Sequence, residues 1–236
     1  MKKLNGEAIV LIGSTSGIGA AILEEIKDEK VSVALTSTRK DALDKQVAAE
    51  QGRGRNVFSR VVDATDEKAV AGFLSDAKAE LGRLDVLVNL AGLSVPVKIQ
   101  ELPAEKFQAM MDINVSATFF STKQFLNLVD PERGGQILNF SSMASKRANG
   151  NAPLYCASKA AVTMLSQATQ INAKDSNVRV TNVCPGAVDS PFWGDRQVPR
   201  EKFLTTGDVA EVVHFLLTRE SRVVIRDIEF ESMDRV

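Results

Sequence analysis

The chain has 236 residues, 44% of them hydrophobic and 25% charged, so it can bury one substantial core and fits the size of a single α/β domain. Its 29 basic and 30 acidic residues leave a formal net charge of -1, which gives no bulk attraction for nucleic acid or an anionic membrane. No apolar run reaches membrane-spanning length, and the run Ala8–Ile12 after the basic start is too short for a signal peptide. We therefore expect a protein that acts on small molecules, with no nucleic-acid or membrane partner.

Short apolar runs rich in β-branched residues alternate with segments of helical periodicity. We expect strands at Ala8–Ile12, Val31–Thr36, Val57–Val62, Leu84–Asn89, Gln136–Phe140, Val178–Cys184 and Val223–Phe230. Helices are expected between them, including a long one from Ala104 to about Val129 and a last one at Val209–Leu217. This alternation predicts one α/β domain over residues 1–236, a doubly wound, seven-stranded parallel sheet with helices on both faces. Ligands of such sheets bind beyond the carboxyl ends of the strands, so the residues after each strand are candidates for the site.

The first expected strand runs into a glycine-rich turn that leads directly into a helix. The turn reads Gly13-Ser14-Thr15-Ser16-Gly17-Ile18-Gly19. Glycines allow a tight turn and a close approach of the backbone, and the free N–H groups at the positive end of a helix attract a pyrophosphate. Glycine is common in turns before helices, but the position after the first strand favours dinucleotide binding.

The residues after the second expected strand bear on which dinucleotide is bound. An acidic residue there would accept the ribose hydroxyls of NAD and repel a 2'-phosphate, but this chain has Ser37, Thr38, Arg39 and Lys40. Hydroxyls and a guanidinium suit a phosphate, so the sequence predicts NADP(H) in preference to NAD(H). The alternative is that Arg39 and Lys40 only begin a solvated helix.

Tyr155 and Lys159 lie four residues apart in a helical pattern, and such residues share one face of a helix. An isolated tyrosine, with a pKa of about 10, is a poor acid or base at neutral pH. A neighbouring cation favours the phenolate, so the pair can act as an acid/base device. The alternative is an inert pair on a solvated helix face.

Together these motifs resemble the short-chain dehydrogenase/reductase family over nearly the whole chain. Gly13, Gly17 and Gly19 match its TGxxxGIG motif, residues 89–92 match its NNAG stretch, and Pro185-Gly186 matches the turn after its sixth strand. The resemblance implies a Rossmann fold and a tyrosine-dependent oxidoreductase that transfers a hydride between nicotinamide and a carbonyl or secondary alcohol. A non-catalytic NADP(H)-binding regulatory or scaffold protein on the same fold is the alternative function.

The resemblance also implies the roles of individual residues. Its catalytic residues match Asn114, Ser142, Tyr155 and Lys159, with the family's thirteen-residue step from the serine to the tyrosine. Tyr155 would donate the proton, Lys159 would lower its pKa and hold the nicotinamide ribose, Ser142 would polarise the carbonyl, and Asn114 would hold a water that links Lys159 to solvent. The implied cofactor-binding residues are Gly13, Ser14, Thr15, Ser16, Gly17, Ile18, Gly19, Ser37, Thr38, Arg39, Asp63, Ala64, Asn89, Ala91, Gly92, Tyr155, Lys159, Pro185, Gly186, Val188 and Ser190. The alternatives are structural roles, in which Ser142 only ends a strand, Asn114 only bends a helix and Lys159 only lies on a solvated face.

The chain departs from the family motifs at two positions. Ile12 replaces the threonine of TGxxxGIG, and Leu90 replaces the second asparagine of NNAG. Losing two polar partners together costs less than leaving one of them buried alone. We therefore predict a direct apolar contact between Ile12 and Leu90, with the cofactor site intact.

Segments 143–154 and 190–205 follow strands at the ligand end of the sheet and are expected to border the substrate. The candidate substrate-binding residues are Ser142, Ala144, Lys146, Arg147, Phe192 and Trp193. Phe192 and Trp193 suit an apolar lid, whereas Lys146, Arg147 and Arg196 suit a substrate anion unless they are simply solvated. The run Ser142–Arg147 and the ending Val223–Phe230 resemble the hydroxy-acid dehydrogenase branch, which weakly favours a small aldehyde, ketone or hydroxy acid.

Residues outside these motifs are expected to have structural uses. Cys156 and Cys184 are too few for a disulfide framework, which fits a reducing cytoplasm. His214 lies in the last helix without a cluster of metal ligands, so we expect no metal site. Surplus apolar positions on two helices suggest, with the resemblance, a homodimer or homotetramer. These positions are Phe107, Met111, Phe119, Phe125, Val162, Leu165 and Ile171.

Overall fold

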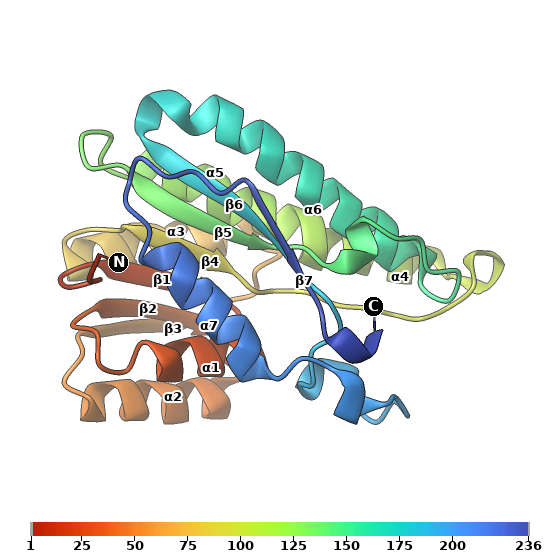
Figure 1. The fold of residues 1–236 in the computed structure, drawn as a ribbon. Helices are drawn as coiled ribbons and strands as arrows, with labels where there is room; N and C mark the ends of the chain where they lie inside the picture. The colour runs from red at the N-terminus through yellow and green to blue at the C-terminus, as the bar shows by residue number, and fades with distance from the viewer. Residues whose placement is uncertain (1, 236) are drawn as a thin grey trace.

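The structure, a computed structural model, describes residues 2–235 and consists of one parallel sheet covered by helices on both faces (Figure 1). Its seven strands lie in the order β3-β2-β1-β4-β5-β6-β7. They are β1 (Ala8–Ile12), β2 (Ser32–Ser37), β3 (Val57–Val61), β4 (Val86–Asn89), β5 (Gly135–Phe140), β6 (Val178–Pro185) and β7 (Asp227–Phe230). The order reverses between β1 and β4, where ligands of doubly wound sheets bind. The predicted fold class is confirmed.

Two helical layers cover the sheet (Figure 1). The α-helices are α1 (Gly17–Glu25), α2 (Lys40–Gly52), α3 (Glu67–Leu81), α4 (Ala104–Met111), α5 (Ala117–Leu128), α6 (Pro153–Asn172) and α7 (Thr206–Leu217). Single 3-10 turns occur at Ile99–Glu101, Met143–Ser145, Ala173–Ser176, Pro191–Trp193, Arg200–Lys202 and Met233–Arg235. Side chains of α1, α2 and α7 share one core cluster, and those of α3 and α5 share the other. Within residues 2–235, no helix has both the length and the apolar character needed to cross a membrane.

The central strand β1 is buried on both faces, as its unbroken apolar run implies. Successive side chains alternate between faces, so Leu11 enters the α1/α7 core and Ile12 enters the α3/α5 core. Leu90 follows β4, where Val88 faces the α1/α7 core, and Leu90 packs against that same core. The main chains of Leu90 and Ile12 are hydrogen-bonded at 3.0 Å, but their side chains belong to opposite faces. The predicted side-chain contact between Ile12 and Leu90 is therefore wrong.

The last strand is shorter than predicted, beginning at Asp227 and not at Val223. Side chains of β6 donate hydrogen bonds to main-chain carbonyls of the segment that precedes β7. Arg179 donates to the carbonyl of Val223 at 3.2 Å, and the Thr181 hydroxyl donates to that of Ile225 at 2.7 Å. These bonds hold the segment beside β6 without ladder pairing, which starts where Asn182 meets Asp227. The apolar composition of residues 223–226 does not reveal that side chains of β6 bind the carbonyls of this segment in place of strand pairing.

Candidate active site

The glycine-rich turn after β1 forms a close-fitting cradle at the start of α1. Gly13 has φ +81°, a conformation that favours glycine, and the N–H groups of Gly13 and Ser14 both donate to the carbonyl of Thr36. A Cβ on Gly19 would lie 2.2 Å from the carbonyl oxygen of Ser14, so only glycine fits there. Ser16 caps α1 by accepting the N–H of Gly19 at 3.0 Å. The positive end of α1 therefore opens onto the carboxyl edge of the sheet.

The segment after β6 folds back over this cradle. A Cβ on Gly17 would lie 2.9 Å from Pro191 and 3.2 Å from the Cβ of Ser190. The two segments are far apart in the sequence, and the missing side chain at Gly17 lets them meet. The structure thus brings Ser190, a predicted nicotinamide contact, against the predicted pyrophosphate turn.

The residues after β2 form a polar corner next to the cradle. The hydroxyls of Thr15 and Ser37 are 2.6 Å apart, and the Ser37 hydroxyl also accepts the N–H of Arg39 at 3.1 Å. The Arg39 guanidinium turns back to donate to the Thr15 hydroxyl at 3.1 Å. Lys40 instead pairs with Asp44 on the exposed side of α2, at 2.6 Å. The solvated-helix alternative therefore describes Lys40, whereas Arg39 faces the corner.

The third part of the predicted cofactor site lies after β3 and β4. The carboxylate of Asp63 accepts the N–H and the hydroxyl of Thr65, which fixes the turn that contains the buried Ala64. A Cβ on Gly13 would lie 3.2 Å from the N of Ala91, so the segment after β4 runs directly beside the glycine turn. The predicted residues are therefore gathered along one edge, at β1, β2, β3 and β4.

A buried ladder of polar side chains lies beneath this edge and was not predicted from the sequence. Asn89, Asn139 and Asn182 are register partners on β4, β5 and β6. Asn89 donates to Asn139 at 2.8 Å and accepts from Ser121 of α5 at 2.7 Å. The Asn89 side chain thus holds α5 to the sheet. Asparagine recurs near the ends of three successive strands, and this recurrence is the sequence pattern that indicates such a ladder.

The long helix predicted from Ala104 is interrupted by one π-helical turn, Asp112–Ser116, which contains Asn114. Such turns are rare and frequently occur at functional sites. The Asn114 amide accepts the N–H of Leu93 at 2.7 Å and donates to the hydroxyl of Ser158 at 2.9 Å. Asn114 therefore connects this helix to the segment after β4 and to α6, one residue before Lys159.

Lys159 is buried under the segment after β4. Its Nζ donates to the carbonyl of Phe140 at 2.8 Å, and a Cβ on Gly92 would lie 3.4 Å from Nζ and 3.3 Å from Oδ1 of Asn114. Burial lowers the pKa of Lys159 to about 8. The predicted alternative of a lysine on a solvated face is wrong, because only 4% of the residue is exposed.

Tyr155 lies one helical turn before Lys159, with Nζ 5.9 Å from the centre of its ring. Burial raises the pKa of the Tyr155 phenol to about 12, and the neighbouring Ser142 and Arg196 act in the opposite direction. The predicted lowering of this pKa by Lys159 is not found, because burial outweighs the nearby charges. Ser142 also accepts the N–H of Ala144 at 3.1 Å, which caps the turn after β5. At neutral pH Tyr155 is therefore a protonated phenol, suited to donate a proton to a group beside Ser142.

Aromatic rings extend from Tyr155 along the segment after β6. The ring of Phe192 lies 6.0 Å from that of Tyr155, and Trp193 meets Phe192 edge-on at the same distance. The Trp193 indole donates to the carbonyl of Val188 at 2.8 Å, which fixes its orientation. Phe192 and Trp193 thus form an apolar wall next to the ring of Tyr155, and its use as a substrate lid stays a prediction.

Lys146 and Arg147 make internal ion pairs with the last strand. Lys146 pairs with Glu229 at 2.9 Å, and Arg147 pairs with Glu231. The hydrogen bond to Glu229 raises the pKa of Lys146. The expectation that these two cations receive a substrate anion conflicts with these contacts, because carboxylates of the chain already neutralise them.

His214 lies outside this constellation, whereas Cys156 and Cys184 border it. His214 approaches Glu25 and Glu29 at 3.6 Å and 3.5 Å, between α7 and the end of α1. Both cysteines are free thiols, and Cys184 is fully buried. Residues 2–235 contain no group of three or more histidine, cysteine or acidic side chains placed to hold a metal ion.

Comparison with known proteins gives a consistent result. Residues 7–200 match the family model described as short chain dehydrogenase. An uncharacterised oxidoreductase of Staphylococcus saprophyticus is 31% identical over 97% of this chain and 98% of its own. An alcohol dehydrogenase of the archaeon Thermococcus sibiricus, solved with 5-hydroxy-NADP, is 29% identical over 97% of each chain, with a TM-score of 0.89. A xylitol dehydrogenase solved with NAD+ is 25% identical over 98% of this chain and 100% of its own, with the same TM-score. The chain belongs to the short-chain dehydrogenase family and is an oxidoreductase.

Proposed function

We propose that this oxidoreductase uses NADP(H) to interconvert a small carbonyl compound and its alcohol, with Tyr155 as the acid/base. The observation that carries the proposal is the placement of the Tyr155 ring, with Lys159 Nζ 5.9 Å from its centre, at the sheet edge that also holds the glycine cradle. The alcohol and xylitol dehydrogenases among the solved relatives support a carbonyl/alcohol pair.

The residues present fit a bound dinucleotide. The cradle has no room for a Cβ at Gly19, and the free N–H groups of α1 suit a pyrophosphate. The corner at the end of β2 offers the guanidinium of Arg39 and the hydroxyls of Thr15 and Ser37. No acidic side chain takes part in these hydrogen bonds, which supports NADP(H). The solved relatives include complexes with cofactors of both types, so the preference rests on this corner.

Each catalytic side chain has a defined task in this proposal. When bound, the nicotinamide supplies the hydride in reduction and accepts it in oxidation. Ser142 donates a hydrogen bond to the carbonyl oxygen, and Tyr155 delivers the proton as negative charge develops there. Lys159, held by Phe140, places a cation near the phenol and stabilises the phenolate that remains. Asn114 positions α6 through Ser158, and its role in holding a water for Lys159 remains a prediction.

Turnover is tested by following NADPH oxidation with a panel of aldehydes, ketones and keto acids. Reduction of panel members supports the proposed reaction. Tight NADPH binding without turnover across the panel would instead support a regulatory or scaffold protein on the same fold.

Replacement of Arg39 by Gln tests the cofactor preference. Removal of the guanidinium eliminates a charge-assisted hydrogen bond to the 2'-phosphate, so kcat/KM with NADPH should fall about tenfold or more, with little change for NADH. Arg222→Gln, an exposed arginine near the start of β7, is the control and should change neither value. A wild-type enzyme that uses NADH better than NADPH would contradict the preference.

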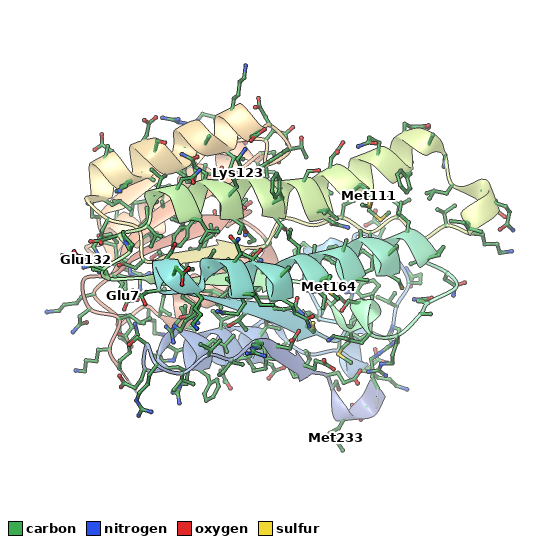
Figure 2. All side chains as sticks on the ribbon, turned by 90° about the horizontal axis from the view of Figure 1, so that it is seen from above. Glu7, Met111, Lys123, Glu132, Met164 and Met233 are labelled. Atoms are coloured by element: carbon green, nitrogen blue, oxygen red, sulfur yellow. The ribbon has the colours of Figure 1, made fainter. Side chains whose placement is uncertain are left out.

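The exposed side of α4, α5 and α6 supports the proposed homodimer or homotetramer. Figure 2 shows α5 and α6 side by side, with Met111 and Met164 labelled on this face. These helices carry the exposed side chains of Phe107, Phe119 and Ile171, and of Met164, which is 63% exposed. The predicted interface positions Phe125 and Val162 are wrong, because both side chains are fully buried in the core of the chain. Several exposed large apolar side chains on neighbouring helices are typical of a subunit interface. We also place the protein in the cytoplasm, because its two cysteines are free thiols.

Light scattering tests the assembly. The wild-type protein should have at least twice the chain mass of 25.5 kDa, and Met164→Glu should lower that mass, because a buried charge at the interface has no partner. Met233→Glu, at an 86% exposed position beyond β7, is the matched control. A monomeric wild-type protein at micromolar concentration would contradict the proposal.

A further inference from the structure

The last strand presents a row of carboxylates to the segment that carries Ser142. Asp227, Glu229 and Glu231 alternate along β7 and its extension, so they lie on one side of the chain. Asp227 accepts hydrogen bonds from Asn182 and Gln167 and serves the buried ladder. Glu229 pairs at 2.9 Å with Lys146, which also approaches Asp227 at 3.8 Å, and Glu231 pairs with Arg147.

These two ion pairs join the segment after β5 to the residues that end the chain's last strand, next to the turn after β6. A Cβ on Gly186 would lie 2.6 Å from the Cβ of Glu231, and the N–H of Gly186 donates to the carbonyl of Phe230 at 2.8 Å. Glu231 therefore packs on the Pro185-Gly186 turn. On the other side, the carbonyl of Arg147 accepts the thiol of Cys156, the residue after Tyr155. The Arg147–Glu231 pair thus spans from the start of α6 to that turn.

The third predicted anion-binding cation, Arg196, is engaged differently. Its guanidinium lies over the rings of Phe192 and Trp193, at 5.5 Å and 5.1 Å from their centres. Two of its N–H groups donate to the carbonyls of the same two residues, at 2.5 Å and 2.8 Å. Arg196 therefore stabilises the apolar wall. The part of this wall that lies next to Tyr155 is the ring of Phe192.

We infer that Glu229 and Glu231 are specificity-determining residues that neutralise Lys146 and Arg147 and so make the enzyme select uncharged carbonyl substrates over those that carry a carboxylate. The inference rests on the proposed function and narrows its substrate class. An unpaired arginine in the segment that follows Ser142 would attract a substrate carboxylate, whereas the paired arginine brings a fixed negative charge with it. Both pairs are partly exposed to solvent, so their effect on selectivity should be moderate.

The test compares keto acids with their methyl esters, which share the reacting ketone and differ in charge. Reduction by NADPH is measured for acetoacetate and methyl acetoacetate, and for benzoylformate and its methyl ester. The variant is Glu231→Gln, which keeps the size of the side chain and leaves Arg147 without its carboxylate. Glu211→Gln, on the exposed side of α7, makes the same change of net charge without an ion pair among the described residues. Thermal unfolding of each variant confirms that it folds.

The wild-type enzyme should prefer each ester to its acid in kcat/KM. Glu231→Gln should raise the acid-to-ester ratio about fivefold, through a lower KM for the acid, and Glu211→Gln should leave the ratio unchanged. A wild-type preference for the acids, or equal ratios in the two variants, overturns the inference while the reductase function stands. Absence of turnover with every carbonyl offered to the wild-type enzyme overturns the proposed function, and the inference with it.

Discussion

Replacement of Tyr155 by Phe should reduce kcat for carbonyl reduction by about 10³-fold or more, because general acid catalysis by a positioned group contributes 10²–10⁴-fold and Ser142 cannot replace the proton donor. The substitution removes only the hydroxyl. The ring keeps its contact with Phe192 at 6.0 Å, and the Lys159 bond to Phe140 does not involve the phenol. The loss should therefore appear in the chemical step and not in folding.

Cofactor binding provides the control for this variant. Trp193 is the one tryptophan of the chain and lies beside the segment that covers the glycine cradle, so its fluorescence should respond to NADPH. Titration should give similar Kd values for Tyr155→Phe and the wild-type protein. Full activity of the variant would contradict the mechanism, because no second tyrosine exists to substitute for it.

Replacement of Gly19 by Ala should weaken NADPH binding by about 100-fold or more. The added Cβ would lie 2.2 Å from the carbonyl oxygen of Ser14, so either α1 or the glycine turn must shift. A shift of either one misaligns the N–H groups that receive the pyrophosphate, and 100-fold in Kd corresponds to about 2.7 kcal/mol. Isothermal calorimetry measures the change directly.

Gly52→Ala is the matched control for this substitution. Gly52 ends α2, and a Cβ there meets no atom within 4 Å, so alanine should leave Kd unchanged and slightly stabilise the helix. If Gly19→Ala binds NADPH as tightly as Gly52→Ala does, the cradle is not the cofactor site.

The fold could be predicted from the sequence, and the proposed catalytic groups could be located in it, because both depend on local patterns. Strand and helix periods differ, and the glycine motif, residues 89–92 and the Pro185-Gly186 turn each lie at the end of a strand that an apolar run marks. Ser142, Tyr155 and Lys159 lie near one another because the turn after β5 carries the first and the next helix carries the other two, so their spacing along the chain is enough to place them together.

Other features depend on contacts between distant segments. The opposite faces taken by Ile12 and Leu90 follow from strand alternation, which the predicted contact overlooked. The pairing of Arg147 with Glu231 joins residues 84 positions apart, and composition showed only that both were charged. The π-helical turn at Asn114 adds one residue to a helical turn, a change that hydrophobic spacing does not resolve.

The account is tested most directly by the fate of the hydride. NADPH carrying deuterium at C4, in either stereochemical position, is incubated with the wild-type enzyme and a ketone of the panel, and the alcohol is analysed by mass spectrometry. The account predicts one deuterium at the carbinol carbon from one of the two labelled forms, and no labelled alcohol with Tyr155→Phe over the same time. Binding of NADPH without transfer of the label to any carbonyl compound of the panel would contradict it.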